Sequence, residues 1–228
     1  MIMTPVMKVS IVIPALNEEK TIGRVIDGCR RYGDEVLVVN GPSADDTALV
    51  AIAHGARIIQ DNGKGKGAAL REAINNVTGE LIVFIDADGS HDPDDIPRLI
   101  EPILNGKADH VTGSRLLGGS SELHGGFDEF FRLMGSSFIT ACINWRYGVS
   151  ISDSQNGFRA IKTDVAKRLA LKENITTIEQ EMIMKTIKRG FTLVEIPTHE
   201  YKRQAGASKI RLTKVWFRYV YSLVKYLI

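Results

Sequence analysis

Cysteine, long apolar runs and a strong net charge are all missing from this sequence of 228 residues. Its two cysteines, Cys29 and Cys142, stand far apart, with no CxxC pair and no histidine-rich neighbourhood, which argues against a disulfide framework and against a zinc site. No uncharged run reaches the roughly 20 residues that a helix needs to cross a bilayer. The apolar start contains Pro5 and Lys8 and leads into strand-like sequence, unlike a secretory signal. We therefore expect a protein of the reducing cytoplasm.

Charge is nearly balanced in total but uneven along the chain. The sequence has 29 basic and 27 acidic residues, a formal net charge of +2. Residues 201–228 contain seven basic residues and no acidic one, so the rest of the chain is acidic. A basic end on an acidic body predicts a localised anionic partner. We do not expect that partner to be nucleic acid.

Short β-branched runs alternate with helical patterns in the first half. Continuous apolar strands separated by amphipathic helices indicate an α/β fold with a mainly parallel central sheet flanked by helices. The expected strands are 8–14, 34–40, 56–60, 80–86 and 108–114, and the expected helices lie near 18–31, 45–54, 65–77 and 94–104. Four of these strands end in polar groups, at 17–19, 40–46, 86–95 and 114–115. Ligands bind beyond the carboxyl ends of such strands, so one shared site is expected there.

The second half is less regular but shows no internal repeat and no dividing linker. A glycine-rich loop at 116–126 precedes an expected helix at 127–147. A strand after SDSQNGFRAI, a helix closed by Gly190 and a strand in FTLVEIP follow. We assign residues 1–210 to a single domain and residues 211–228 to a basic amphipathic helix.

The stretch LIVFIDADGSHDP, residues 81–93, places Asp86 and Asp88 at the end of the fourth apolar run. Carboxylates at i and i+2 lie on one side of an extended strand and repel each other, and a divalent cation removes that repulsion. The plainest interpretation is a solvated turn that caps the next helix. An EF-hand fits poorly, because Gly89 is fourth in the loop and Pro97 occupies the last ligand position. A phosphatase of the haloacid dehalogenase type, with Asp86 as nucleophile, and a sugar-nucleotide site with a bound metal remain.

The other strand ends favour the sugar-nucleotide site. VIPALNEE and VVNGPSADDT precede the aspartates, and GSR, SDSQNGFR and RQAGASK follow them. Together these motifs resemble glycosyltransferase family 2, most closely its dolichyl or polyprenyl phosphate mannose or glucose synthase branch. The resemblance covers about residues 8–212, with the motifs in the expected order. It implies a GT-A type, Rossmann-like domain and an inverting transferase that uses a nucleotide diphosphate sugar.

The resemblance also implies which residues meet the donor. The expected contacts are Pro14, Asn17, Glu18, Asn40, Ser43, Asp45, Lys66, Asp86, Ala87 and Asp88. Asp86 and Asp88 match the metal motif of the family and imply Mg²⁺ or Mn²⁺, with Asp88 as the principal ligand. Asn40 stands near the position of a base-contacting acid, and Asn both donates and accepts where Asp only accepts. The base, guanine or uracil, is therefore left open.

Four basic residues match positions at which the family meets phosphates. They are Arg115, Arg132, Arg203 and Lys209. The resemblance assigns all four to the acceptor phosphate and assigns catalysis to Asp88 together with Arg115, Arg203 and Lys209. Arginine suits bidentate recognition of phosphate, and lysine adds a mobile charge.

The acceptor is expected to be a polyprenyl or dolichyl phosphate. Many relatives use an acid in an ED pattern to deprotonate a hydroxyl acceptor, and TIEQEM offers only Glu179 and Glu181 outside that pattern. A phosphate oxygen is already anionic at neutral pH and needs no base. The alternative is a soluble hydroxyl acceptor, with dependence on a carboxylate such as Glu181. The resemblance leaves the oligomeric state open, a homo-oligomer included.

The C-terminal stretch adds an argument for a membrane surface. Arg211, Lys214, Arg218 and Lys225 recur at helical spacing, with apolar and aromatic residues on the other faces. An amphipathic helix of this composition is typical of an interfacial anchor. Near an anionic leaflet each basic residue contributes about 1 kcal/mol. We expect peripheral binding to the cytoplasmic face, while a helix packed on the domain is the alternative.

Overall fold

The computed structural model describes residues 7–121, 127–203 and 212–228 and contains a seven-stranded sheet. Its strands are β1 (Val9–Ala15), β2 (Glu35–Asn40), β3 (Arg57–Gln60), β4 (Leu81–Phe84), β5 (His110–Ser114), β6 (Arg159–Lys162) and β7 (Leu193–Pro197). They lie in the order β3-β2-β1-β4-β6-β5-β7. Neighbouring strands run parallel except where β6 pairs with β4 and β5.

The reversed direction of β6 brings its start to the edge where its neighbours end. Arg159 is in register with Phe84 at the end of β4 and with Thr112 near the end of β5. Residues 153–158 therefore lie at the same edge as the polar ends of β1, β2, β4 and β5. The strand order changes direction between β1 and β4, the kind of position where open α/β sheets bind ligands.

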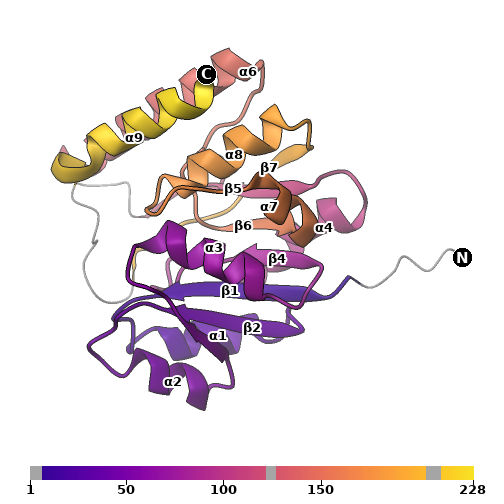
Figure 1. Ribbon diagram of the computed structural model, residues 1–228, viewed down its shortest axis with the longest axis vertical. Coiled ribbons are helices and arrows are strands. Elements are labelled where there is room, and N and C mark those ends of the chain that lie inside the picture. Colours follow the sequence, from indigo (N-terminus) through magenta and orange to yellow (C-terminus); the bar gives the residue numbers. More distant parts are fainter. Residues whose placement is uncertain (1–6, 122–126, 204–211) are drawn as a thin grey trace, which may run out of the picture.

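Helices cover both faces of the sheet and create two apolar cores (Figure 1). On one face lie α1 (Ile22–Cys29), α2 (Thr47–Ala53) and α4 (Ile96–Leu104), and on the other lie α3 (Lys66–Asn76), α7 (Thr163–Leu169) and α8 (Ile178–Lys188). Two short elements follow strands at the carboxyl edge of the sheet: the 3-10 turn Pro93–Asp95 comes after β4, and α5 (Arg115–Gly118) comes after β5. Successive residues of β1 alternate between the cores: Ile11 and Ile13 enter the first, and Val12 enters the second.

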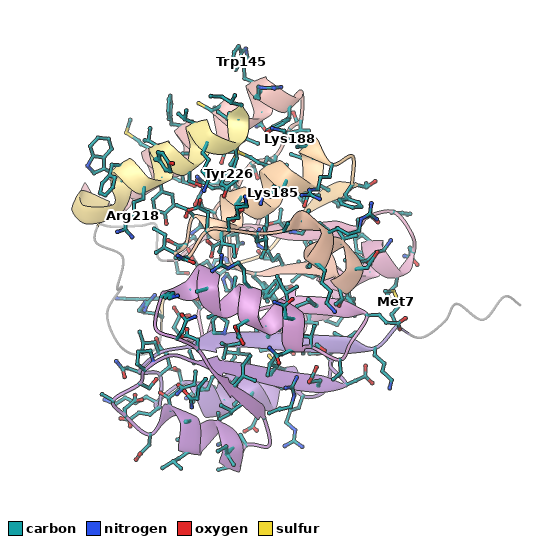
Figure 2. The ribbon with its side chains drawn as sticks, in the orientation of Figure 1. Met7, Trp145, Lys185, Lys188, Arg218 and Tyr226 are labelled. Carbon is teal, nitrogen blue, oxygen red and sulfur yellow. The ribbon has the colours of Figure 1, made fainter. Side chains whose placement is uncertain are left out.

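A third layer is formed by α6 (Phe127–Tyr147) and α9 (Leu212–Leu227), which lie side by side over α8 (Figure 1). Its small core contains Ile143 from α6, Met184 from α8, and Leu223 and Tyr226 from α9. Tyr226 also lies beside Lys185, whose amine is 5.2 Å from the ring centre (Figure 2). Among the described helices, none combines the length and the apolar character that a membrane span requires.

The predicted α/β architecture is confirmed, with differences at the element ends. The fourth strand ends at Phe84 instead of residue 86, because the chain leaves the sheet before Asp86. The first helix begins at Ile22 instead of near residue 18, after a turn in which Asn17 adopts a φ of 54°. The predicted C-terminal helix is present, and one of its faces packs on the domain.

Candidate functional site

Two cavities open at the carboxyl edge of the sheet and meet at one boundary. The first, which we name the strand-end cavity, has a volume of about 420 Å³ and lies against the ends of β1 and β2 and the start of α3. The second, the helix-roofed cavity, measures about 330 Å³ and is lined in part by α6 and α9. Five residues line both: Lys66, Asp86, Asp88, Thr176 and Arg203. Both aspartates of the DADGS motif therefore stand at the junction.

The strand-end cavity collects most of the expected nucleotide contacts. Those that line it are Pro14, Glu18, Lys66, Asp86, Ala87 and Asp88. Asp61, directly after β3, lines it as well, and its side chain accepts a hydrogen bond from the backbone of Gly63. Asp61 was not predicted from the sequence, because a polar end was expected for every strand of the first half except β3. The polar pair Asp61 and Asn62, directly after that strand, could have indicated it.

Three other expected nucleotide contacts bond to one another instead of lining a cavity. The Ser43 hydroxyl donates to the side-chain oxygen of Asn40 at 2.8 Å and accepts from the backbone N–H of Asn17 at 3.0 Å. Asn40 is buried and donates to the side chain of Gln60 at 3.1 Å. These bonds join the loops after β1 and β2. Direct contact of Asn17, Asn40 and Ser43 with a nucleotide stays a prediction.

Asp45 has a similar position in the same pair of loops. Its carboxylate accepts from the backbone and the hydroxyl of Thr47 at the start of α2, and from the backbone N–H of Glu19 at 3.2 Å. Thr47 in turn accepts from the backbone of Glu18 at 2.8 Å. These bonds fix Glu18 against the strand-end cavity, so Asp45 supports the cavity wall from behind.

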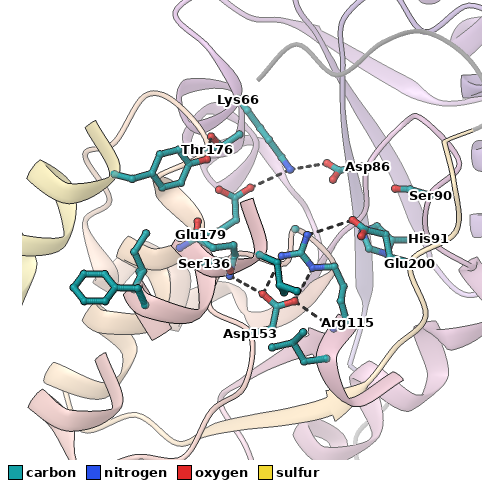
Figure 3. Close-up of a pocket in the computed structure, with 18 of the residues that line it drawn as sticks. Lys66, Asp86, Ser90, His91, Arg115, Ser136, Asp153, Thr176, Glu179 and Glu200 are labelled. Atoms are coloured by element: carbon teal, nitrogen blue, oxygen red, sulfur yellow. Dashed lines mark hydrogen bonds and ion pairs between the residues drawn. The ribbon is translucent and has the colours of Figure 1, made fainter. Parts of the chain in front are cut away.

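A lysine bridges two carboxylates at the junction of the cavities (Figure 3). The Lys66 amine lies 2.6 Å from Asp86 and 3.0 Å from Glu179, which is in the first turn of α8. Gly157 leaves the room for this bridge, because a Cβ there would be 2.8 Å from the Lys66 amine and 2.9 Å from an Asp86 oxygen. The glycine of the NGF stretch is therefore required by packing at the site.

Asp88 is paired with a second cation. Its Oδ2 lies 2.8 Å from the Arg203 guanidinium, and its Oδ1 accepts from the backbone N–H of Ser90 at 3.0 Å. Asp88 is buried. Both aspartates of the motif thus have a positive partner in this structure, which removes the mutual repulsion that the sequence implied.

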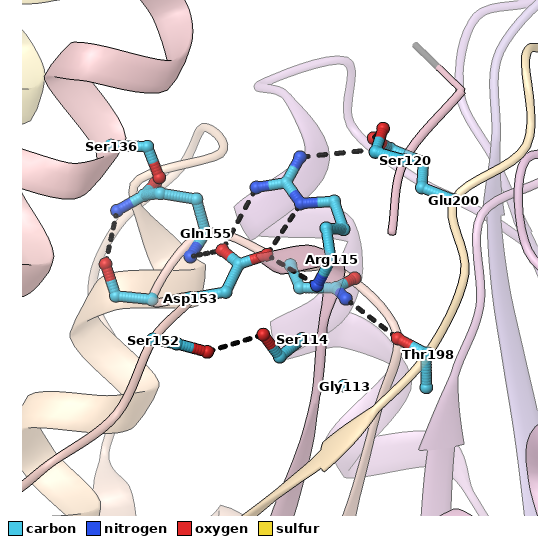
Figure 4. A network of polar contacts seen from close by, with 12 residues as sticks. Gly113, Ser114, Arg115, Ser120, Ser136, Ser152, Asp153, Gln155, Thr198 and Glu200 are labelled. Atoms are coloured by element: carbon cyan, nitrogen blue, oxygen red, sulfur yellow. Dashed lines mark hydrogen bonds and ion pairs between the residues drawn. The ribbon is translucent and has the colours of Figure 1, made fainter. Parts of the chain in front are cut away.

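Arg115 is held by two acidic side chains (Figure 4). Its Nε and Nη2 donate to the two oxygens of Asp153 at 2.7 and 3.0 Å, and its Nη1 lies 3.4 Å from Glu200. Glu200 also accepts from the Ser120 hydroxyl at 2.6 Å. The guanidinium is therefore fixed at the wall of the helix-roofed cavity, with its charge already balanced.

These ion pairs set the pKa values at the site. Burial is the largest influence on the pKa of Asp86 and acts to raise it, but the charge and the hydrogen bond of Lys66, together with other nearby basic groups, hold the pKa below its ordinary value. Burial also acts to raise the pKa of Asp153, but the charge and the hydrogen bonds of Arg115, together with the backbone hydrogen bond from Gln155, lower it below its ordinary value. Burial acts to lower the pKa of Lys66, and Asp86 and Glu179 together raise it above the ordinary value. Asp86, Asp153 and Lys66 are accordingly charged at neutral pH.

His91 is a cavity residue that was not predicted from the sequence. It is buried, lines the helix-roofed cavity and stacks on Phe158 with ring centres 5.0 Å apart. Burial lowers its pKa, against the raising effect of Asp86 and Glu200. The ring is therefore neutral at pH 7 and presents a polar but uncharged group to the cavity.

The far wall of the helix-roofed cavity is apolar. It is lined by Leu116, Leu133, Phe138, Ile139, Trp216 and Val220. Phe138 and Trp216 are 63% and 61% exposed, so the lining continues onto the outer surface of α6 and α9. The cavity therefore has a charged end at the junction and an apolar end that reaches the surface.

Several predicted or alternative residues lie elsewhere. Lys209 is outside the described residues, and Arg132 is in α6 but its side chain is outside them. Glu181, on which the hydroxyl-acceptor alternative depended, is buried away from both cavities. Its carboxylate accepts from the backbone of Lys172 at 2.8 Å and pairs with Lys185 at 2.7 Å. The carboxylate of this helix that reaches the cavity is Glu179.

The oxygen groups at the junction suit a hard divalent cation only in part. In the described ranges no cluster of three or more His, Cys, Asp or Glu side chains is arranged to hold a metal. Asp86 and Asp88 offer two carboxylates at the meeting point of the cavities. Mg²⁺ is commonly held by one or two carboxylates, its other ligands being water and substrate phosphates. The two aspartates therefore fit a metal that arrives with a diphosphate.

Comparison with known proteins gives a consistent result. Residues 10–169 match the family described as Glycosyl transferase family 2. The chain is 30% identical over 201 residues to Glycosyltransferase AglJ of Haloferax volcanii, covering 87% of this chain and 65% of AglJ. It is 28% identical over 208 residues to the dolichyl-phosphate hexose transferase of the same organism, covering 88% of this chain and 86% of that protein.

A solved structure shares the fold. It is the glucosyl-3-phosphoglycerate synthase of Mycobacterium tuberculosis in complex with Mn²⁺, UDP-glucose and phosphoglyceric acid. It superposes with a TM-score of 0.80 at 23% identity, over 97% of this chain and 80% of that one. The predicted GT-A type fold is thereby confirmed.

Proposed function

The chain belongs to glycosyl transferase family 2, and we propose that it moves a hexose, mannose or glucose, from a nucleotide diphosphate sugar to a polyprenyl or dolichyl phosphate. The observation that carries this proposal is the amphiphilic helix-roofed cavity. Lys66, Arg203 and Arg115 stand at its charged end, and an apolar wall leads from there to the surface. A phosphate head with an isoprenoid chain has the same division of polarity.

The donor fits the strand-end cavity in this proposal. The nucleoside lies between the loops after β1 and β2, near Glu18 and Asp61. The diphosphate reaches the junction, where Lys66 and Arg203 supply positive charge. Mg²⁺ or Mn²⁺ held by Asp86 and Asp88 would supply further neutralisation of the leaving diphosphate. The base, GDP or UDP, stays open.

The transfer itself needs no proton to be removed. An oxygen of the lipid phosphate attacks the anomeric carbon of the hexose, the bond from that carbon to the diphosphate oxygen breaks, and the nucleoside diphosphate leaves with the electron pair. Attack from the opposite side inverts the configuration. The protein's part is to hold two anions in line and to balance the charge on the leaving group. Once the Arg203 guanidinium leaves Asp88, it is suited to bind the acceptor phosphate. Arg115 holds the wall of the helix-roofed cavity in place.

The outer surface of α6 and α9 supports membrane association. Large side chains exposed there are Met134, Phe138, Trp145, Trp216, Phe217, Val220, Tyr221 and Val224. Trp145 is 86% exposed and projects from α6 (Figure 2). We propose that this surface, the roof face, lies in the interfacial region of a bilayer and admits the lipid acceptor to the cavity.

A hydroxyl acceptor is the second candidate. It is favoured by Glu179, a buried carboxylate in the cavity that could accept the proton of an attacking hydroxyl. The fold relative above was solved with phosphoglyceric acid, a soluble compound. This candidate makes no use of the apolar wall.

A panel of donors and acceptors tests the proposal. The protein is incubated with Mn²⁺ and labelled GDP-mannose, UDP-glucose or UDP-N-acetylglucosamine, in vesicles with or without polyprenyl phosphate. We expect label in the lipid fraction with a hexose donor and only when the lipid phosphate is present. Asp88→Asn should remove it. Binding of no nucleotide-sugar in a parallel thermal-shift panel would contradict the proposal, since a ligand at 100 times its Kd stabilises by about 2.7 kcal/mol.

A further inference from the structure

The contacts of the described residues satisfy only one oxygen of the Glu179 carboxylate. The residue is 3% exposed, and its Oε1 pairs with Lys66. Its Oε2 is buried and has no hydrogen-bond partner among the described residues. An unsatisfied carboxylate oxygen is costly in a folded protein. Glu179 lines the helix-roofed cavity, and rotation of its carboxylate would present this oxygen to a ligand there.

The position of Glu179 restricts what that ligand can be. Lys66 and Asp86 line both cavities, whereas Glu179 lines only the helix-roofed cavity. With the nucleoside in the strand-end cavity and the diphosphate at the junction, the transferred sugar is the next group, and it enters the helix-roofed cavity beside Glu179. Figure 3 shows Glu179 and Asp86 on either side of the Lys66 amine.

The chemistry of the group restricts it further. An ionised carboxylate accepts hydrogen bonds and donates none. A lipid phosphate has no donor to offer it and carries the same sign of charge. A sugar hydroxyl has the donor that the free oxygen lacks, and hydrogen bonds to charged groups are among the stronger ones.

We infer that Glu179 is a specificity-determining residue that accepts a hydrogen bond from a hydroxyl of the transferred hexose, oriented for it by Lys66. The inference rests on the proposed function, because it requires a nucleotide-sugar donor. It gives Glu179 a role in choosing the sugar that is separate from metal binding at Asp86 and Asp88. It also distinguishes Glu179 from Glu181, whose oxygens are already satisfied by backbone groups and by Lys185.

The test compares binding of a nucleotide with binding of its sugar conjugate. Calorimetry with Mn²⁺ measures UDP against UDP-glucose and GDP against GDP-mannose, for the unaltered protein and for Glu179→Gln. We expect the variant to keep its affinity for the nucleoside diphosphate within about twofold and to bind the nucleotide-sugar about tenfold or more weakly. One deoxy analogue of the bound sugar should weaken binding to the unaltered protein but not to Glu179→Gln. Glu181→Gln, which alters a carboxylate of the same helix, should leave the sugar's contribution intact.

Three results would overturn the inference. Equal weakening of nucleotide and nucleotide-sugar would make Glu179 only a support for Lys66. A lower turnover with unchanged nucleotide-sugar affinity would make it a general base. Unchanged binding and turnover would leave it without a role in either. If the unaltered protein binds neither nucleotide-sugar, the proposed function fails as well, and that result is recognised without any variant.

Discussion

Asp88 and Arg203 form the ion pair on which the proposed metal site depends. Their side chains are 11% and 23% exposed, and the charged atoms lie 2.8 Å apart. Arg203 therefore occupies one oxygen of the residue that would hold the cation. Binding of a metal with its diphosphate would exchange one positive partner of Asp88 for another and release the guanidinium toward a phosphate.

Removal of that guanidinium should make metal binding easier when no donor is present. We predict that Arg203→Gln raises the affinity for Mn²⁺ about threefold to tenfold, because the ion no longer competes for Asp88. Free Mn²⁺ measured by electron paramagnetic resonance gives the affinity directly. Lys202→Gln, which removes the same charge from an exposed neighbour, is the matched control. Equal Mn²⁺ affinity of all three proteins would show that Arg203 does not compete with the metal for Asp88.

The Asp153 and Arg115 pair gives the fold an acid-sensitive element. Because the pKa of Asp153 is lower in the folded protein than its ordinary value, its charged form stabilises the fold above about pH 4, and this contribution is lost as pH falls through the folded pKa. We predict that Asp153→Asn costs about 3 kcal/mol of unfolding free energy at pH 7, because the Arg115 guanidinium, which is only 12% exposed, loses its main partner. Urea titrations at pH 7 and at pH 3 should show this difference shrinking in acid. A difference that is independent of pH would contradict the assignment.

Individual site residues were predictable from sequence only where they followed a strand end or a motif. Arg115 stands directly after β5, Asp86 and Asp88 follow the end of β4 closely, and the structure brings Arg203 to Asp88. Glu179 was set aside in the sequence because it lies outside an ED pattern. Glu179 and Lys66 are 113 positions apart in the chain. They come into contact only because α8 packs against the sheet.

At the scale of elements, α9 is connected to the wall of both cavities through one loop. The Tyr219 hydroxyl lies 2.5 Å from that of Thr176, and Lys225 pairs with Glu173 at 2.9 Å. The same loop touches the start of α3, where the Ala68 backbone N–H donates to the carbonyl of Asn174 at 3.2 Å. The position of the C-terminal helix is therefore linked to the helix that carries Lys66.

Loss of the hydroxyl contact should weaken donor binding from a distance. We predict that Tyr219→Phe lowers the affinity for UDP or GDP with Mn²⁺ about twofold to fivefold and costs about 1 kcal/mol of stability. Calorimetry and urea unfolding measure the two effects. Tyr221→Phe removes a hydroxyl from an exposed position of the same helix and should change neither. Nucleotide affinity that is the same in Tyr219→Phe and in the unaltered protein would mean that α9 and the donor site are independent.

The sequence predicted the helical pattern of α9 better than it predicted its outward face. Spacing alone suggested a stripe of four basic residues. Of these, Lys225 is exposed but paired with Glu173, Arg218 is exposed and stacks on Phe217, and the side chains of Arg211 and Lys214 lie outside the described residues. In the part of α9 whose side chains are described, the exposed surface also carries Trp216, Phe217, Val220, Tyr221 and Val224. Which side of a helix is buried depends on its neighbours, here α6 and α8, and the sequence of the helix does not contain them.

At the scale of the whole molecule, the roof face borders the helix-roofed cavity, because α6 and α9 carry the one and line the other. An apolar surface beside the mouth of the helix-roofed cavity would let a lipid reach the site without crossing water. The exposed apolar residues Leu49 and Ile52 are on α2, which packs on one face of the sheet, whereas α9 packs on α8, which covers the other face. They provide a comparison of similar polarity that is unconnected to the cavity.

Vesicle binding should depend on the roof face and not on apolar exposure in general. We predict that the double variant Trp216→Ser, Phe217→Ser binds anionic vesicles at least tenfold more weakly, because each buried side chain of this size contributes about 1.5–3 kcal/mol. Sedimentation with vesicles of 30% phosphatidylserine measures it. Leu49→Ser with Ile52→Ser should bind as the unaltered protein does. Equal loss in both double variants would argue against a specific membrane face.

The most direct test of the central claim is the identity of the product when both kinds of acceptor compete. The protein is given one nucleotide-sugar that it binds, Mn²⁺, polyprenyl phosphate in vesicles and 3-phosphoglycerate in solution at equal concentration, and the products are followed by ³¹P nuclear magnetic resonance. We predict a hexosyl phosphodiester of the lipid as the main product. Hexose linked to the hydroxyl of the soluble acid, with the lipid phosphate unchanged, would contradict the account.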